Sequence, residues 1–562
     1  MKDRAASRKP RGTFVSGPLA TRDAALFTDL YEITMAASYL REGMNGLATF
    51  SLFARKLPKE RSFLIAAGLE DVLNYLRDFR VSRAAIRYLS SLGRFDADFL
   101  DFLGGLRFTG EVRAVPEGTV VFQDEPLVEV TAPIIEAQIV ETAVLNLIHF
   151  QTLLTSKAVR SVLAARGRPV VEFGLRRTHG IDAGMKAARC AFIAGAPMSS
   201  NVLAGLYYGI PPTGTMAHSY VSAFPHEIDA FRAFARAFPA YTILLIDTYD
   251  TVAAAHKAVE VAKEMEARGH RLAGVRLDSG DIVALSKEVR RVLDGAGLED
   301  VKIFVSGGLD EDSMERFLAE GAPIDAFGVG TRMDVSADAP YLDMAYKLVE
   351  YEGRHVLKTS PGKATWTGRK QVYRFLGRDG RFVGDRIALR DESPPRGEVE
   401  FLLRTVIEGG RLLAPHPPLT AVRDFCAAQI AALPEEVRRL RDAAPYPVTY
   451  SDRLVLLQRS LEAEVEATEV APTRRRAGRA APEISAKRLP TRGAPMAKFG
   501  KSLQPPRSPK AGVPPEESVS PPRVRRRQKT VHVAVRKGTT LLQTGHGPRV
   551  VRGAKSPKVK KR

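Results

Sequence analysis

Cysteine is nearly absent from this sequence. Cys190 and Cys426 are the only two in 562 residues, and neither lies near the other. They provide neither a disulfide framework nor a CxxC metal site, so we expect a reducing, cytoplasmic setting. The chain also lacks an apolar run of about 20 residues, the length that crosses a bilayer. The basic start from Met1 to Arg11 is not followed by the apolar segment of a signal peptide. We therefore expect a soluble protein without membrane contact.

Acidic residues are scarce in the last part of the chain. Between Ala471 and Arg562, 25 Lys and Arg residues face three acids, a net charge of +22. Because the whole chain carries +20, the preceding 470 residues are almost neutral, at −2. This tail is rich in Pro, Ser, Arg and Lys and poor in large apolar side chains, so it cannot bury enough surface to fold. We predict a disordered tail, in which Thr530 to Gln543 alternates as a transient strand would.

The body before this tail has the composition of a globular enzyme. Hydrophobic residues make up 44% of the chain and charged residues 26%, which suffices for two or three domains with a large core. Helical periodicity predicts helices over Leu26 to Leu40, Glu70 to Phe79 and Ile134 to Leu163. Short β-rich runs broken by Gly and Pro cover Leu106 to Val130. A second β-rich section, Val356 to Leu389, precedes a mixed helical segment that ends near Glu466.

A series of short buried strands, each followed by a helical stretch, occupies the middle of the chain. Four of these strands follow one another at about 30 residues, the length of one βα unit, which predicts a parallel sheet or a (β/α) barrel. In such barrels the chemistry lies at the carboxyl ends of the strands. The predicted strands are Pro169 to Phe173, Tyr241 to Ile246, Leu272 to Arg276, Val301 to Ser306 and Asp325 to Val329.

The carboxyl ends of these strands carry unusual residues. Arginines there suit a phosphate or carboxylate, because the guanidinium fork forms bidentate, charge-assisted bonds. Glycine turns let backbone N–H groups approach a phosphate, and aspartates can hold Mg²⁺ or ribose hydroxyls. Together they predict a site for a phosphorylated sugar and an acidic partner. The segments are Glu172 to Arg177, Ser199 to Asn201, Gly214 to Ser219, Asp247 to Asp250, Arg276 to Asp281, Ser306 to Gly308 and Gly328 to Thr331.

Each of these segments also has a structural explanation. A Gly-x-Gly-Thr such as Gly328 to Thr331 is often only a tight turn, and a lone histidine such as His218 is more often a hydrogen-bonded structural residue. Asp278 to Asp281 can be an Asx turn that opens a helix. Asp247 to Thr251 superficially resembles the phosphoribosyl loop of Rossmann-like transferases, but lacks its adjacent acidic pair and its Thr-Gly. The recurrence of motifs at successive strand ends favours the functional interpretation.

Several motifs resemble the nicotinate phosphoribosyltransferase family in the family's order, across roughly residues 20 to 450. They are Thr28 to Met35, Glu172 to Arg177, Ser200 to Gly205, Gly214 to Ser219 and Leu277 to Asp281. The resemblance implies an irregular (β/α) barrel, a mixed α+β domain built from both ends of the catalytic body, and a homodimer with shared active sites. The implied layout is a flexible basic start (1–20), an N-terminal mixed domain (21–150), the barrel (151–345), a C-terminal part of the body (346–470) and the tail (471–562).

The resemblance also implies a role for each site residue. His218 is expected to be phosphorylated by ATP and to drive the joining of nicotinate to phosphoribosyl pyrophosphate. Imidazole suits that role, because its neutral nitrogen attacks a phosphate near pH 7 and phosphohistidine transfers its phosphate onward. Phe173 and a neighbouring subunit's Tyr31 are similar to the two rings that enclose the pyridine. Their alternative roles are core packing for Phe173 and a helix-face contact for Tyr31.

The remaining expected site residues bind the substrates or a metal. Arg276 is expected to contact substrate, Asp278 the ribose hydroxyls, and Arg176 the region of the phosphates and base. Mg²⁺ is expected as cofactor, with Asp281 as its carboxylate. The expected nicotinate contacts include Thr215 and Ser219, and the cradle of the 5′-phosphate consists of Gly307, Gly308, Gly328, Gly330 and Thr331.

Asn201 bears on whether the substrate is nicotinate or nicotinamide. The nicotinamide-using relatives carry an aspartate at the matching position, where it accepts a bond from the amide. An aspartate would repel a nicotinate carboxylate, whereas asparagine can donate to it, so Asn201 favours the acid. Gly214 and Thr215 point the same way. The pyridine nitrogen carries no proton to remove, so the reaction needs alignment and charge stabilisation rather than a general base.

Two other functions remain open from the sequence. A quinolinate-using phosphoribosyltransferase without ATP coupling would need more basic residues for two carboxylates and no phosphohistidine. A nucleic-acid or anionic-surface binding protein would use the tail 471–562, since polycations bind polyanions in a salt-dependent manner. The tail has no interleaved aromatic residues and no recognised nucleic-acid module, so such binding would be indifferent to sequence.

Overall fold

Six parallel strands form the sheet that carries the predicted site. In the computed structural model, which describes residues 23–360 and 365–470, their order is β7-β6-β11-β10-β9-β8. The sheet is curled and open, and corresponds to part of an irregular barrel. All five predicted strands are present, and β7 is an additional short edge strand. The strands are β6 (Val170–Glu172), β7 (Met198–Ser199), β8 (Ile243–Leu245), β9 (Gly274–Leu277), β10 (Lys302–Val305) and β11 (Ala326–Val329).

Helices alternate with these strands, and four of them, α8, α11, α12 and α13, begin at a polar side-chain cap. The Asp250 side chain accepts the Ala253 N–H and so starts α11, while Asp310 and Ser313 form a capping box at α13. These caps lie just beyond the strand ends, so each chain reversal brings polar side chains to the same edge of the sheet. The helices are α7 (Ile181–Ile193), α8 (Val202–Tyr208), α9 (His218–Ser222), α10 (Glu227–Ala237), α11 (Thr251–Glu266), α12 (Ile282–Asp294), α13 (Glu311–Ala319) and α14 (Thr331–Asp334).

A second, seven-stranded sheet takes its strands from both ends of the body, as predicted. Its order is β13-β12-β1-β5-β3-β17-β18, and its neighbouring strands pair antiparallel. The long strand β1 pairs with β5 on one side and with β12 on the other. The strands are β1 (Leu47–Lys56), β3 (Glu111–Ala114), β5 (Pro126–Pro133), β12 (Asp343–Tyr351), β13 (Arg354–His355), β17 (Arg404–Glu408) and β18 (Arg411–Leu412).

Two smaller sheets complete this mixed domain. One has the order β16-β14-β15-β19, and the other pairs β2 with β4. The predicted β-rich section Val356 to Leu389 contains the hairpin of β14 and β15. The strands are β2 (Leu64–Ile65), β4 (Val120–Val121), β14 (Lys370–Leu376), β15 (Phe382–Leu389), β16 (Val399–Phe401) and β19 (Val448–Tyr450).

The helices of the mixed domain refine two predictions. The helix predicted over Leu26 to Leu40 begins only at Leu30, after a short 3₁₀ turn. The helix predicted over Ile134 to Leu163 is divided at Val140 into α5 and α6. The helices are η2 (Ala24–Leu26), α1 (Leu30–Arg41), α2 (Leu69–Arg77), α3 (Arg83–Ser91), α4 (Ala97–Gly105), α5 (Ile134–Ile139), α6 (Glu141–Ala164), α15 (Leu419–Ala432), α16 (Glu435–Arg438), α17 (Asp452–Val465) and η4 (Glu466–Val470).

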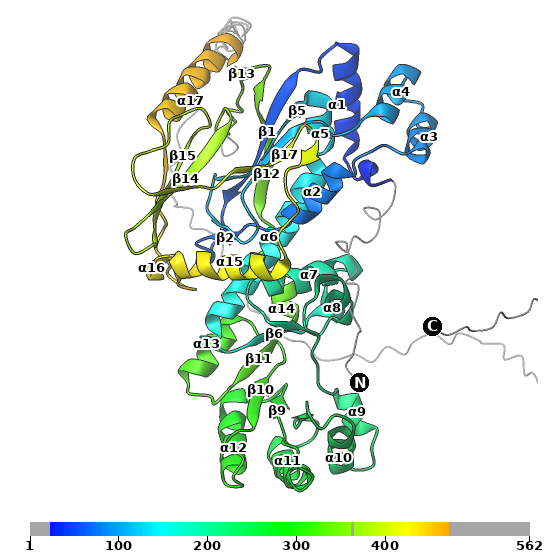
Figure 1. The fold of residues 1–562 in the computed structure, drawn as a ribbon, viewed down its shortest axis with the longest axis vertical. Coiled ribbons are helices and arrows are strands. Elements are labelled where there is room, and N and C mark those ends of the chain that lie inside the picture. The colour runs from blue at the N-terminus through cyan, green and yellow to red at the C-terminus, as the bar shows by residue number, and fades with distance from the viewer. Residues whose placement is uncertain (1–22, 361–364, 471–562) are drawn as a thin grey trace, which may run out of the picture. The chain divides into compact units, whose positions relative to one another are not determined.

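The 24-residue helix α6 joins the mixed domain to the parallel sheet (Figure 1). Its Lys157 and Arg160 both bind Glu311 at the start of α13, with shortest distances of 2.6 and 2.8 Å. These charges are buried and paired, so the helix is held in one position against α13. Within residues 23–360 and 365–470, no helix is both long and apolar enough to cross a bilayer. The predicted basic start, the tail and its strand at Thr530 to Gln543 lie outside the described residues.

Candidate active site

His218 lies where the loop Gly214 to Ser219 meets two strand ends. It begins α9, and its Nδ1 is 3.2 Å from the Thr248 Oγ1, which follows β8. Its Nε2 is 4.0 Å from the Asp278 Oδ2, which follows β9, and 45% of the histidine side chain is exposed. The imidazole is therefore accessible while a hydroxyl and a carboxylate orient it. Thr248 and Asp278, which follow His218 by 30 and 60 residues, thus meet it at the strand ends, as expected from the strand order.

Arg276 contacts the same loop from β9. Its Nη1 donates to the Thr215 Oγ1 at 2.5 Å, and its Nε is buried without a hydrogen-bond partner among the described residues. Burial lowers the pKa of Arg276, and the carboxylates of Asp278 and Asp247 partly offset this effect. The nearby charge of Arg176 lowers it further. Two guanidinium groups therefore lie near one another and face a site that an anion can occupy.

A pair of aspartates connects the ends of β8 and β9. The Asp247 Oδ2 accepts the backbone N–H of Asp278 at 2.9 Å and the Ser279 hydroxyl at 2.6 Å. The Ser306 hydroxyl, after β10, donates to the Asp278 Oδ1 at 2.5 Å. The Asp247 Oδ1 is buried and has no hydrogen-bond partner within the described ranges. Asp247 follows a predicted strand, but no site role was expected for it; only its position after that strand could have indicated one.

The glycine predicted to hold a phosphate after β10 also allows a close backbone approach. Gly307 has a φ of +90°, and a Cβ there would lie 1.8 Å from the carbonyl oxygen of Asp278. Gly308 has a φ of +64° and open space around it. Both therefore adopt the left-handed conformation that favours glycine.

Phe173 packs against two glycines of the turn after β11, with its ring on Gly328 and its backbone on Gly330. Its centroid is 5.7 Å from that of Phe304, with the rings tilted by 50°. A Cβ on Gly328 would lie 2.7 Å from the Phe173 ring, and a Cβ on Gly330 would lie 2.8 Å from the Phe173 carbonyl oxygen. These glycines are needed for ring and backbone packing, whatever else they bind. Thr331 begins α14 directly after them, and its phosphate contact stays a prediction.

Asn201 has a clear structural role. Its Oδ1 accepts the Ala204 N–H at 3.0 Å and caps α8, while its Nδ2 donates to the Gly184 carbonyl at 3.2 Å. The side chain is buried. Its hydrogen-bonding groups are thus largely engaged within the protein, and its contact with the nicotinate carboxylate stays a prediction.

The other predicted residues lie in different surroundings. Asp281, the predicted metal ligand, is exposed and caps α12 by accepting the Ala284 N–H at 3.2 Å. Ser219 is exposed in the first turn of α9, and Arg176 is exposed in the 3₁₀ turn η3 (Leu175–Arg177). Tyr31 is 48% exposed on α1, in the mixed domain. Burial, followed by the charges of Glu141 and Glu32, raises the pKa of Tyr31 to about 12.

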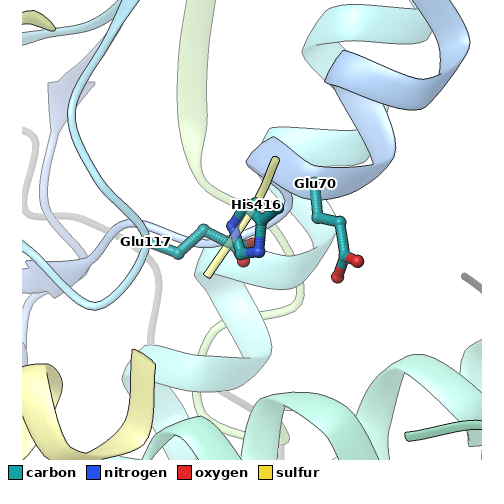
Figure 2. A group of neighbouring side chains, drawn as sticks. All are labelled: Glu70, Glu117 and His416. Atoms are coloured by element: carbon teal, nitrogen blue, oxygen red, sulfur yellow. The ribbon is translucent and has the colours of Figure 1, made fainter. Parts of the chain in front are cut away.

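Glu70, Glu117 and His416 gather elsewhere, between α2 and the loop before α15 (Figure 2). Their ligand atoms lie within 4.8 Å of one another, a spacing that could suit a metal ion. However, the His416 Nε2 faces Glu117 at 2.9 Å and its Nδ1 faces the Pro417 carbonyl at 3.0 Å, so both ring nitrogens can donate. The Arg189 guanidinium already bridges Glu70 and Glu117. We interpret the cluster as a compensated charge network rather than a metal centre.

Comparison with known proteins gives a consistent result along the body. Residues 26–149 match the N-terminal domain of nicotinate phosphoribosyltransferase (NAPRTase), residues 169–383 match the NAPRTase family, and residues 396–458 match the C-terminal domain. The nicotinate phosphoribosyltransferase pncB2 of Mycobacterium tuberculosis is 53% identical over 435 residues, which cover 77% of this chain and 92% of the relative.

Two further relatives extend the comparison. The nicotinate phosphoribosyltransferase of Bacillus subtilis is 37% identical, over 76% of this chain and 93% of its own length. The crystal structure of human nicotinic acid phosphoribosyltransferase matches with a TM-score of 0.70 and 32% identity, over 77% of this chain and 99% of that one. The chain therefore belongs to the nicotinate phosphoribosyltransferase family, as its motifs indicated.

Proposed function

We propose that this chain joins nicotinate to 5-phospho-α-D-ribose 1-diphosphate, giving nicotinate mononucleotide and diphosphate for NAD synthesis, and that ATP drives the reaction through His218. The observation that carries this proposal is the meeting of His218, Arg276 and Asp278 at adjacent strand ends. They provide a nucleophile, a cation and a carboxylate within one site.

In the proposed transfer, the pyridine nitrogen forms a bond to the anomeric carbon as the bond to diphosphate breaks. The ring nitrogen donates its lone pair and has no proton to lose, so the site needs no general base. Arg276 and Arg176 would stabilise the negative charge of the substrates, and Phe173 would contact the pyridine ring. Asp278 would accept bonds from the ribose hydroxyls.

In the proposed ATP step, an imidazole nitrogen of His218 attacks the γ-phosphate and ADP leaves. The exposed ring can reach a nucleotide, and Asp278 would stabilise the positive charge that develops on the ring as the N–P bond forms. The phosphohistidine is later hydrolysed. The energy of that step would favour product formation rather than activate the pyridine nitrogen.

Mg²⁺ is the expected cofactor, and carboxylates near the site suit its preference for oxygen. Asp247 fits better than Asp281, because its Oδ1 is buried without a described partner whereas Asp281 caps α12. Asp247 and Asp278 would hold the ion, which would neutralise part of the diphosphate charge when bound.

A homodimer with shared sites is also proposed. Large apolar side chains are exposed near the start of α7 and on α8, with Ile181 at 74% and Val202 at 73%. Exposed apolar side chains of this size favour a partner surface. The partner's α1 would bring Tyr31 to the ring of Phe173. A cytoplasmic location is consistent with the free, buried thiols of Cys190 and Cys426.

The experiment that tests the proposed function compares nicotinate, nicotinamide and quinolinate as substrates of the full chain, with and without ATP. We expect nicotinate to be preferred and ATP to stimulate its conversion. Preference for quinolinate, with release of CO₂, would overturn the choice of substrate. Failure to trap acid-labile ³²P on wild type under turnover conditions would overturn the coupling through His218.

A further inference from the structure

Two buried carboxyl groups lie against the same residue, Gly174, directly after Phe173. Glu172 is the last residue of β6 and Asp334 is the last residue of α14; their exposures are 0% and 5%. Gly174 lies between them: its N–H donates to the Glu172 Oε1 at 2.5 Å, and a Cβ on it would lie 1.9 Å from the Asp334 Oδ2. In the part of the chain that the structure describes, neither carboxyl group forms an ion pair with a basic side chain.

The donors around the pair assign its proton. Both oxygens of Glu172 accept hydrogen bonds, one from the Gly174 N–H and the other from the Ser199 hydroxyl. The Asp334 Oδ2, by contrast, is buried with no donor among the described residues. Burial, followed by the negative charge of Glu172, raises the pKa of Asp334 well above its usual range, although the nearby Gly174 N–H acts in the opposite direction. These contacts favour Asp334 as the partner that carries the proton.

The same pair connects three segments of the site. Glu172 immediately precedes Phe173, and Asp334 ends the helix that follows the Gly328 to Gly330 turn. Through Ser199, whose hydroxyl accepts the Asn201 N–H at 2.9 Å, the network also reaches the end of β7. A shift of either carboxyl group would move the segments predicted to hold the pyridine ring and the 5′-phosphate.

The basic side chains of α6, α7 and α14 are occupied elsewhere. On α6, Lys157 and Arg160 bind Glu311, and His149 accepts the Leu342 N–H. The cations of α7 bind Asp71 and Glu117, and Arg332 of α14 binds Asp310. The other charged residues on these elements are Glu141 of α6, Asp182 of α7, and Arg176 and Arg177 of η3. Among the described residues, no basic side chain of α6, α7 or α14 is therefore free to replace the shared proton.

We propose that Glu172 and Asp334 are positioning residues that share one proton, and that their O–H···O link holds Phe173 and the turn before α14 in the arrangement that receives nicotinate. This inference rests on the proposed function for its substrate. It assigns the two groups unequal roles, since Asp334 must donate and Glu172 must only accept.

Matched amide substitutions test this inequality in the full chain. Asp334→Asn keeps a donor towards Glu172, whereas Asp334→Leu, of similar size, has none. Glu172→Gln places an N–H group against one of the two groups that donate to Glu172, the Gly174 N–H and the Ser199 hydroxyl. We expect Glu172→Gln and Asp334→Leu to raise the KM for nicotinate by about tenfold with a much smaller change in kcat, and Asp334→Asn to rescue most of that loss. Equal effects of Asp334→Asn and Glu172→Gln, or no rescue relative to Leu, would overturn the proposal.

The pH profile adds a readout that a purely structural role would not change. As pH rises, wild type should lose the shared proton and its kcat/KM should fall, whereas Asp334→Asn, which has no proton to lose there, should lack this decrease. Profiles of identical shape would contradict the proposal.

Stability gives a test that does not depend on substrate. Because the folded pKa of Asp334 is raised, its stabilising effect is complete below about pH 4 and is lost as pH rises towards the folded value. The unfolding free energy of wild type should therefore decrease relative to Asp334→Asn with rising pH. Wild type that fails to use nicotinate would overturn the proposed function alone, whereas a pH-independent difference would overturn the carboxyl pair.

Discussion

The guanidinium of Arg189 on α7 binds both oxygens of Glu117 at 3.1 and 2.6 Å, and both side chains are almost completely buried. Burial alone would raise the pKa of Glu117, but the charges of Arg189 and His416 hold it well below its usual range. Since α7 begins just after the loop of Phe173 to Arg177, this pair connects the mixed domain to the substrate site.

Removing one member of this pair should be strongly destabilising. Glu117→Gln would leave the buried Arg189 without its main counter-charge, and we expect a loss of about 3–5 kcal/mol in the free energy of unfolding. The matched control is Asp96→Asn, which weakens the exposed pair of Arg41 and Asp96, keeps a side chain that can cap α4, and should have a much smaller effect. Denaturant titration measures both, and equal losses would contradict the burial argument.

Stability should also depend on the protonation of His416. Burial alone would lower its pKa, but the hydrogen bond and charge of Glu117 raise it. Because the folded-state pKa is raised, the stabilisation by protonated His416 is complete below its unfolded-state pKa of about 6.5. It is lost as pH rises through the folded-state pKa. We expect the unfolding free energy to fall across this window in wild type and to be flatter in His416→Gln. Parallel curves of unfolding free energy against pH for the two proteins would show that His416 is not the source of the pH dependence.

His218→Ala should abolish ATP-dependent labelling. We expect wild type to retain acid-labile ³²P from γ-labelled ATP and the variant to retain none, because the variant lacks the nucleophile. His416→Ala is the control, since that ring lies in the charge network. Label that persists in His218→Ala would show that another residue carries the phosphate.

Two neighbouring glycines should respond differently to alanine. Gly307→Ala would force a Cβ to 1.8 Å from the Asp278 carbonyl oxygen, so the ends of β9 and β10 must move. We expect a loss of about 10²-fold or more in kcat/KM. At Gly308 an added Cβ has open space, so Gly308→Ala adds only the backbone strain of its positive φ, about 1 kcal/mol. It should reduce stability more than activity. Kinetics and thermal unfolding of both variants separate the two effects.

Truncation after residue 470 should leave the catalytic activity in place. The body carries its own core and near-neutral charge, whereas the removed segment carries +22. We expect the truncated protein to convert nicotinate at the wild-type rate but to lose salt-dependent retention on heparin or DNA. Loss of transfer by a folded truncated protein would give residues 471–562 a catalytic role.

The sequence was sufficient to predict the parallel strands and the edge at which the site lies, because short buried runs and the polar residues after them are local signals. The segments that contain His218 and Asp278 were selected in this way, whereas their roles came from the family resemblance and stay predictions. Tertiary pairings were not predictable: nothing near Asp247 indicates that it accepts the Asp278 N–H, and nothing near Glu172 indicates Asp334. The capping role of Asn201 depends on Gly184, which a local pattern does not reveal.

The seven-stranded sheet also constrains how the chain is made. Val112 of β3 pairs with Ile407 of β17, so one edge of β3 has no partner until nearly the whole body has left the ribosome. During that time the strand presents open N–H and C=O groups, to which another chain can pair. Synthesis that stops before β17 would therefore yield an aggregation-prone fragment, even if every residue of the substrate site had already been made.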